Sequence, residues 1–146
     1  MFVSDAVVRL QHTDAAGVMF FPRIYEFAHV AYEELLESIG EAIPQDMPGA
    51  AYIIPIVHSE ADYRTSLRVG DRVRIEARVV RLRGRSFTMH YTISHPGDGA
   101  VAATVQTVHV VVDPKTHKAR TMPDALRDGL TTYYVPEDAS GASEDG

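Results

Sequence analysis

The chain has 146 residues, the size of a single domain, and 45% of them are hydrophobic, which is enough to bury a core. It contains no cysteine, which excludes disulfides, a thiolate nucleophile and a zinc–thiolate site. The formal charge of −6 is concentrated at the end, because residues 136–146 contain four acids and residues 1–135 carry only about −2.

The composition also indicates how the chain is organised. We expect one domain over residues 1–135 and an acidic, disordered tail over residues 136–146. No apolar run is long enough to cross a membrane, and the N-terminus lacks the basic and apolar regions of a signal peptide. We therefore expect a cytoplasmic protein that has no membrane partner.

The first elements in chain order are a strand, a turn and the start of a helix. Residues 5–11 predict a short strand, and Asp14 follows in a turn of small residues that ends at Gly17. Pro22 is favoured at the first helical position, which makes Phe21 the N-cap. Phenylalanine has no side-chain oxygen for the free N–H groups of the first turn. A buried helix start of this kind needs another acceptor, such as a ligand carbonyl oxygen.

The helix itself is predicted over residues 22–39, with Gly40 as a left-handed cap. On a helical wheel its apolar side chains fall within about 120° of arc, which is typical of a helix with one buried face. This predicted core stripe consists of Ile24, Phe27, Ala28, Ala31, Leu35 and Ile39. Residues 41–51 contain two prolines and a glycine and are predicted to form a loop.

Four further strands are predicted after this loop, and the second of them alternates cleanly between apolar and charged residues. They cover residues 53–63, 71–82, 85–94 and 100–112. One helix cannot cover both faces of five strands, so the expected α+β fold is a curved antiparallel sheet of about five strands wrapped around one long helix. After Pro114 the chain is polar and rich in turns.

The segment from Asp14 to the helix also resembles a known family. A turn of the form D-x-A-G-V, then aromatic residues, then a helix reading A-H-x-A-Y-E-E, is similar to the 4-hydroxybenzoyl-CoA thioesterase branch of the hotdog-fold superfamily. Within that branch the chain most resembles the 1,4-dihydroxy-2-naphthoyl-CoA thioesterases of quinone (menaquinone or phylloquinone) biosynthesis. The resemblance covers residues 5–113 and implies a hotdog fold and a homo-oligomer, either a dimer or a homotetramer.

The resemblance implies that Asp14 is the catalytic carboxylate. Thioester hydrolysis requires a nucleophile or a base, and a group that holds the developing oxyanion. With neither cysteine nor a G-x-S-x-G elbow, carboxylate or histidine remains, and Asp14 is either the nucleophile or the base that activates water. The Phe21 backbone N–H matches the donor to the thioester oxygen, and Gly17 permits the tight path before it. We expect Asp14 to be buried beside that amide; the alternative is a simple turn hydrogen bond.

The resemblance also suggests a pocket for the acyl group. His29 and Tyr25 are expected to lie against the acyl ring, together with Ile54 and Pro55 of the partner subunit. The alternative for His29 is a histidine satisfied by a neighbouring carbonyl or paired with Glu33 on the same helix. The alternative of another functional class is a non-catalytic hotdog module that binds acyl-CoA.

The basic residues suggest where coenzyme A is held. Eight arginines fall between residues 64 and 85, while the acidic balance of the chain and its scarcity of lysine argue against a nucleic-acid partner. Arg83, Arg85 and Ser86 resemble the family's basic hairpin, and bidentate guanidinium groups suit the CoA phosphates. The alternative is a solvated strand face with salt bridges to Glu76.

The remaining histidines give no metal-ligand spacing, so we expect no metal and no cofactor other than the CoA of the substrate. His12 either assists Asp14 or leaves the strand as an exposed residue. The predicted activity is hydrolysis of an aromatic acyl-CoA, best 1,4-dihydroxy-2-naphthoyl-CoA. The alternatives are a 4-hydroxybenzoyl-CoA or a broad short-chain acyl-CoA thioesterase.

Overall fold

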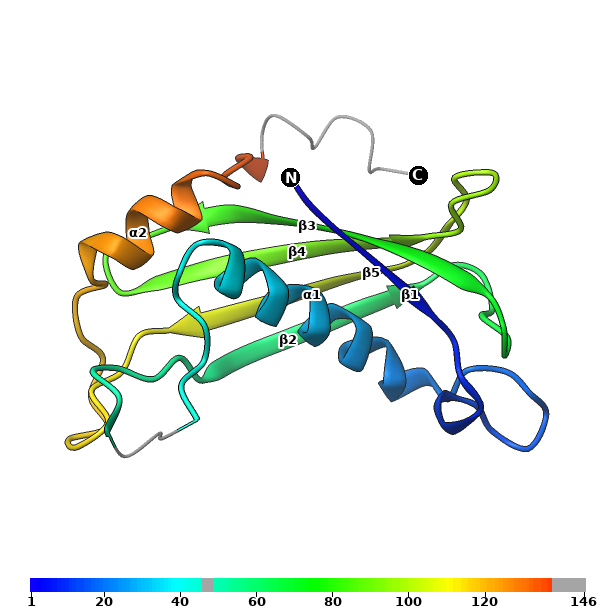
Figure 1. Cartoon of the computed structure of the whole chain (residues 1–146), viewed down its shortest axis with the longest axis horizontal. Coiled ribbons are helices and arrows are strands. Elements are labelled where there is room, and N and C mark those ends of the chain that lie inside the picture. The colour runs from blue at the N-terminus through cyan, green and yellow to red at the C-terminus, as the bar shows by residue number, and fades with distance from the viewer. Residues whose placement is uncertain (46–48, 138–146) are drawn as a thin grey trace.

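A computed structural model describes residues 1–45 and 49–137 of the chain. Five antiparallel strands form one sheet in the order β1-β3-β4-β5-β2, and the long helix α1 lies across one face of it (Figure 1). The predicted α+β architecture is therefore confirmed. The elements are β1 Phe2–Val7, α1 Ile24–Ser38, β2 Ile56–Tyr63, β3 Arg72–Leu82, β4 Ser86–Ser94, β5 Val101–Val110 and α2 Asp124–Thr131.

The helix start differs from the prediction. A 3₁₀ turn over Phe21–Arg23 precedes α1, and the residue that caps this turn is Phe20, with no side-chain hydrogen bond. The N-cap of α1 itself is Arg23, so the prediction of Phe21 as the N-cap was wrong, and α1 begins two residues later than predicted. The fixed backbone angle of Pro22 suits a 3₁₀ turn as well as an α-helix, so proline alone does not locate the start of the α-helix.

The buried face of α1 follows the predicted stripe, except that Ile39 is only half-buried. Gly40 has a φ of +79°, and the Glu41 N–H donates to the Leu36 carbonyl at 2.8 Å, as in a glycine-capped helix end. The predicted cap is therefore confirmed. Two residues from the border of the stripe are buried as well, and the buried set is Ile24, Phe27, Ala28, Ala31, Tyr32, Leu35 and Leu36.

Several strand boundaries differ from the prediction, two of them for clear local reasons. β1 covers Phe2–Val7 instead of residues 5–11, and it ends at Val7 because Leu10–His12 wind into a 3₁₀ turn. β2 begins at Ile56, three residues later than predicted, because Pro55 has no N–H to give to the sheet. Before it, Ile53 makes only an isolated bridge to Val112.

The sequence failed to predict α2. Only Leu126 and Leu130 of this helix are buried, and one i,i+4 pair is too short a pattern to indicate a helix. Beyond it, the Tyr133 carbonyl accepts from the Val79 N–H and the Val135 N–H donates to the Val79 carbonyl. This segment covers the β3 edge beyond β1, whereas β2 has no described strand on its outer side. None of the described helices is long and apolar enough to cross a bilayer.

Gly129 allows α2 to approach the end of α1. A Cβ atom at Gly129 would lie 2.7 Å from the Cβ atom of Ile39. Overpacking costs about 1–3 kcal/mol, more than the gain of up to about 1 kcal/mol in helix propensity. We expect Gly129→Ala to lower the melting temperature, measured by circular dichroism. Gly97→Ala is the control, because a Cβ there meets nothing within 4 Å. Equal or higher stability of Gly129→Ala would contradict this packing.

Candidate functional site

Asp14 lies at the tip of a short hairpin that leads into the helix. Thr13 bridges Met19, and the Asp14 N–H donates to the Val18 carbonyl at 2.9 Å. Gly17 closes the turn with a φ of +77°, which glycine adopts without strain, and its N–H donates to the Asp14 carbonyl at 3.0 Å. The chain around Gly17 therefore has the tight path that the sequence indicated.

The Asp14 side chain is exposed, so the expectation of a buried aspartate is wrong for the single chain. Its Oδ1 atom accepts hydrogen bonds from the Ala16 N–H at 2.8 Å and the Val18 N–H at 3.4 Å. Among the described residues none donates to Oδ2. The turn hydrogen bonds of the alternative reading are therefore present, and they leave one carboxylate oxygen available for chemistry.

The Phe21 backbone lies at the other end of the hairpin. Its N–H makes no hydrogen bond to a described residue, and its carbonyl accepts from the Tyr63 hydroxyl at 2.5 Å. Burial raises the pKa of Tyr63, so this hydroxyl stays protonated and donates. A hollow of about 360 Å³ opens beside Phe21, and its walls include Val18, Met19, Tyr63 and Leu67.

The hairpin brings the two predicted catalytic groups into one short segment. The Asp14 N–H donates to the Val18 carbonyl and the Phe20 N–H donates to the His12 carbonyl. Asp14 lies at the tip of this hairpin, and the 3₁₀ turn that begins at Phe21 follows it directly. The carboxylate and the Phe21 amide are therefore held on the same hairpin and its exit.

A second pocket, of about 300 Å³, lies between the C-terminal half of α1 and the segment that follows it. His29 and Ile54 both line it, so a single chain already brings these two predicted residues together without a partner. Tyr25 is half-buried against the core and Pro55 is exposed, and neither lines this pocket. Apolar side chains dominate its wall, among them Leu36, Ile43, Ile53 and Ile54.

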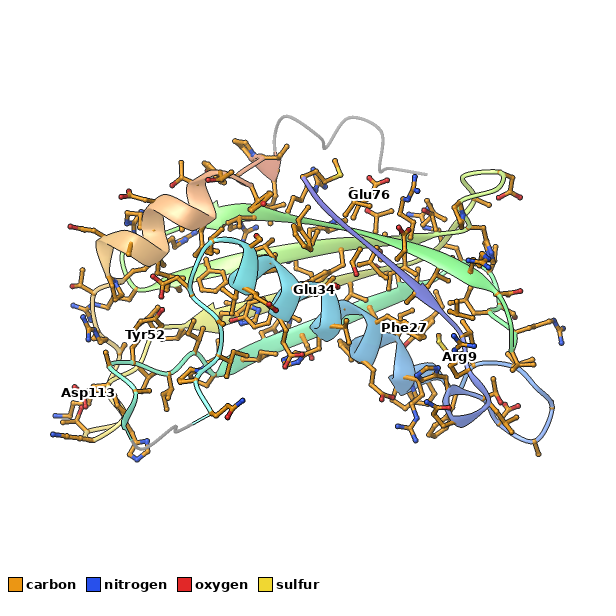
Figure 2. The ribbon with its side chains drawn as sticks, viewed as in Figure 1. Arg9, Phe27, Glu34, Tyr52, Glu76 and Asp113 are labelled. Atoms are coloured by element: carbon orange, nitrogen blue, oxygen red, sulfur yellow. The ribbon has the colours of Figure 1, made fainter. Side chains whose placement is uncertain are left out.

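Two polar residues of this pocket were missed by the sequence analysis. The Tyr52 hydroxyl donates to Glu41 Oε2 at 2.6 Å, and both residues line the pocket. Burial, followed by the hydrogen bond and the charge of Glu41, raises the pKa of Tyr52, so its hydroxyl stays protonated. The residues lie at the two ends of a loop without periodicity, and no sequence signal indicates that they meet. In Figure 2, Tyr52 lies toward the end of the molecule that holds Asp113, away from Phe27.

Behind the pocket wall lies a buried histidine. The His109 ring is stacked between those of Tyr32 and Phe87, at centroid distances of 4.5 and 4.8 Å. Its Nε2 atom lies 2.8 Å from the Thr107 hydroxyl, and its buried Nδ1 atom has no hydrogen-bond partner among the described residues. Burial, and to a smaller extent the charge of His29, lowers the pKa of His109 to about 3, so the ring is neutral near pH 7.

Hydrogen bonds hold the backbone of the predicted CoA-binding hairpin in place. The Arg83 N–H donates to the half-buried Ser86 at 2.8 Å, and the Arg83 carbonyl accepts from the Arg127 side chain of α2. The Arg83 and Arg85 side chains are exposed, and neither pairs with a described acid, Glu76 included. The hairpin therefore presents two guanidinium groups to solvent, and their contact with the CoA phosphates stays a prediction.

His12 is neither free nor exposed. Its Nδ1 atom accepts from the Arg9 N–H at 2.8 Å, and its ring lies 4.8 Å from that of Phe27. His12 therefore holds the 3₁₀ turn against α1, and its predicted assistance to Asp14 stays untested. Within residues 1–45 and 49–137, no group of three or more potential ligands is placed to hold a metal.

Comparison with known proteins identifies the family. A model of the thioesterase-like superfamily matches residues 8–130. The chain belongs to this superfamily. A 1,4-dihydroxy-2-naphthoyl-CoA hydrolase from Synechococcus elongatus is 34% identical over 85% of this chain and 90% of its own. One from Nostoc punctiforme is 30% identical over 97% of this chain and 93% of its own.

A solved structure shows the same architecture in a thioesterase. A 1,4-dihydroxy-2-naphthoyl-CoA thioesterase from Synechocystis superposes with a TM-score of 0.84 and 25% identity, covering 89% of this chain and 95% of the other. The hotdog fold and the family resemblance are therefore confirmed, and the reaction class of this thioesterase is thioester hydrolysis. The parts played by individual site residues stay predictions.

The buried His109 makes the stability of this thioesterase depend on pH. The unfolded chain takes up a proton near pH 6.5, the native imidazole only near pH 3. The stabilisation that comes from keeping His109 neutral is complete above pH 6.5 and is lost as the pH falls toward 3. The free energy of unfolding falls there by up to about 1.4 kcal/mol per pH unit. We expect His109→Leu to flatten the fall in urea-unfolding free energy between about pH 6.5 and 4. His117→Asn, in an exposed turn, is the control that keeps the slope. Identical slopes in the two variants would contradict the assignment.

Proposed function

We propose that this thioesterase hydrolyses 1,4-dihydroxy-2-naphthoyl-CoA to the free acid and coenzyme A, a reaction of quinone biosynthesis. The observation that supports this most strongly is that relatives with this activity in their names match nearly the whole chain at 30–34% identity. The apolar pocket of about 300 Å³ with a few polar groups is of the kind that holds an aromatic acyl group.

Asp14 and Phe21 divide the chemistry between them. The free Oδ2 atom of Asp14 either attacks the thioester carbonyl carbon or takes a proton from an attacking water. The Phe21 N–H donates to the carbonyl oxygen as it becomes an oxyanion, and the adjoining helix start adds a favourable dipole. The C–S bond then breaks and the CoA thiolate leaves. In the route through water, the free acid forms directly and the proton taken by Asp14 passes to the thiolate. In the route through attack by Asp14, water hydrolyses the resulting acyl–Asp14 anhydride, which gives the free acid, restores the carboxylate and supplies the proton of the thiol.

The free edge of β2 supports a homodimer. Every residue of β2 except Ala61 is exposed, and an uncovered edge strand is a ready surface for pairing with a second copy. Exposed apolar side chains lie on β2 and on the neighbouring helix start: Phe20, Phe21, Ile56, Val57 and Tyr63. Association of two such dimers into a tetramer is a further prediction of the family resemblance.

Antiparallel pairing of two β2 strands about their middle would complete the site. Tyr63 of the partner subunit then lies opposite Ile56. This end of β2 is next to the pocket lined by His29 and Ile54, which we call the acyl pocket. In each chain the Tyr63 hydroxyl donates a hydrogen bond to the Phe21 carbonyl. Pairing of the strands would therefore bring the partner's Phe21 amide to this pocket. The Arg83–Arg85 hairpin lies at the same end, since Phe87 pairs with His109 and His109 with Ile56. The acid of one subunit thus comes near the acyl pocket and the arginine hairpin of the other, at each end of the dimer.

A thiol-release assay over a panel of CoA esters tests the function. We expect the highest kcat/KM for 1,4-dihydroxy-2-naphthoyl-CoA, with lower values for 4-hydroxybenzoyl-CoA and aliphatic esters. Asp14→Asn is expected to lower kcat by at least a hundredfold at unchanged melting temperature, because it removes the nucleophile or base. Tight ester binding without thiol release by the wild type would instead indicate a non-catalytic module. Full turnover by Asp14→Asn would remove this residue from the mechanism.

Mixing two inactive variants tests whether the site is shared between subunits. Asp14→Asn lacks the acid, and Ile54→Trp fills the acyl pocket. If the acid of one chain serves the pocket of the other, a mixed dimer contains one site in which both residues are native. We expect activity to return when the two variants are unfolded and refolded together, but not when each is refolded alone. An inactive mixture that light scattering shows to be dimeric would contradict the shared site.

A further inference from the structure

The acyl pocket has an unusual carboxylate in its wall. Most of its lining is apolar, with Leu36, Ile43, Ile53 and Ile54 among the lining side chains. A carboxylate beside such a surface loses hydration and needs hydrogen-bond donors in return. Glu41 lines the pocket all the same and has one such donor, the Tyr52 hydroxyl at 2.6 Å.

The second oxygen of Glu41 is available to a ligand. Tyr52 donates to Oε2, and in the described part of the chain no group donates to Oε1. An ionised carboxylate accepts several hydrogen bonds and donates none. The hydrogen bond from Tyr52 joins the segment before β2 to the residue that follows the end of α1. Because Oε2 is held by this bond, the direction of the Glu41 carboxylate is fixed. What the pocket offers at this point is therefore an oriented acceptor for a donor on the ligand.

We propose that Glu41 determines substrate specificity by accepting a hydrogen bond from a ring hydroxyl of the acyl group. The inference rests on the proposed function and goes beyond it by naming the residue that recognises the hydroxyl. The name 1,4-dihydroxy-2-naphthoyl places one hydroxyl next to the thioester-bearing carbon and the other on C4. The C4 hydroxyl points away from the reacting carbonyl and into the pocket, so it is the one that Glu41 receives.

Glu41 acts on specificity because its Oε1 atom gains a hydrogen-bond donor from the substrate only when the C4 hydroxyl is present. An acyl ring without it would take water from Oε1 and offer no donor in exchange. Hydrogen bonds to charged groups are stronger than those between neutral groups. Burial and the bond to Glu41 raise the pKa of Tyr52, so Tyr52 keeps its proton and does not compete as an acceptor. The pocket therefore favours a hydroxylated ring over an otherwise identical ring.

Two esters that differ by one hydroxyl test this assignment. Kinetics are measured with 1,4-dihydroxy-2-naphthoyl-CoA and 1-hydroxy-2-naphthoyl-CoA, and the quantity compared is the ratio of their kcat/KM values. We expect the wild type to favour the dihydroxy ester by about tenfold or more, and Glu41→Gln to reduce this ratio by about tenfold to a hundredfold. In the glutamine variant the amide oxygen faces Tyr52, and an N–H₂ group then faces the substrate hydroxyl.

Tyr52→Phe is the matched control. It removes the same hydrogen bond from the loop but keeps the carboxylate, which loses only its fixed direction, so the preference for the dihydroxy ester should fall by a smaller factor than in Glu41→Gln. A purely structural Glu41 would instead give, in Glu41→Gln, an equal change for both esters and a lower melting temperature. That result, or a wild type without preference between the esters, would overturn the proposal. If Glu41→Gln does not fold, Glu41→Asp, which withdraws the carboxylate by one methylene, must show the loss of preference.

Binding of the free acids separates this inference from the proposed function. Calorimetry compares 1,4-dihydroxy-2-naphthoate with 1-hydroxy-2-naphthoate on the wild type and Glu41→Gln. If neither ester is hydrolysed, the proposed function fails, but a preference for the dihydroxy acid that disappears in Glu41→Gln still supports the recognition by Glu41. Equal binding of the two acids by the wild type would overturn that recognition whatever the kinetics show.

Discussion

The straight course of α1 across the sheet separates the two halves of the candidate site. Its buried stripe holds the helix against β1, β3 and β5, so the helix cannot bend or shift without exposing core residues. The 15 residues of α1 extend for about 22 Å. The hairpin of Asp14 lies before one end, whereas the pocket runs along the helix from His29 to Leu36 and past its other end to Glu41 and Tyr52. An acyl ring at Glu41 and Tyr52 is too short to reach the hairpin at the far end of the same helix.

This constraint explains why the predicted aspartate is exposed in a single chain. A buried, unpaired carboxylate is costly, and Asp14 avoids that cost by remaining in solvent until a second surface covers it. The exposed aromatic rings of Phe20 and Phe21 beside it, and the free edge of β2, are the surface that a second copy would cover. In the proposed homodimer, burial of the acid would come from the second copy, and a single chain leaves it exposed.

The parts of the fold that the sequence predicted are those with a repeating pattern. The stripe of α1 and the alternation of β3 repeat over many residues, so several positions report the same element. The missed features have no such pattern. α2 buries only Leu126 and Leu130, and the 3₁₀ turn at Phe21 differs from an α-helical start by one hydrogen-bond step.

The candidate site was predictable only where it is local in sequence. Asp14, Gly17 and Phe21 belong to one continuous turn and helix start, and a family motif can describe such a segment. Glu41 meets Tyr52 across a loop, and His109 is stacked between rings from α1 and β4. These contacts depend on strand register and loop closure, which no single segment encodes. Ile54 was predicted to lie near His29 but to come from the partner subunit, whereas the structure places both residues in one pocket of the same chain. The sequence does not encode the path of the loop that brings them together.

The position of Glu41 relative to the helix dipole gives a further reason to regard it as functional. The start of α1 carries a partial positive charge, which favours a developing oxyanion at Phe21. The other end carries a partial negative charge, and Glu41 follows that end by only three residues, where a carboxylate is disfavoured. Folding alone would be better served there by a neutral or basic residue. A chain that keeps a carboxylate against this preference, and orients it with a tyrosine in an apolar pocket, gives up some stability for recognition of a ligand.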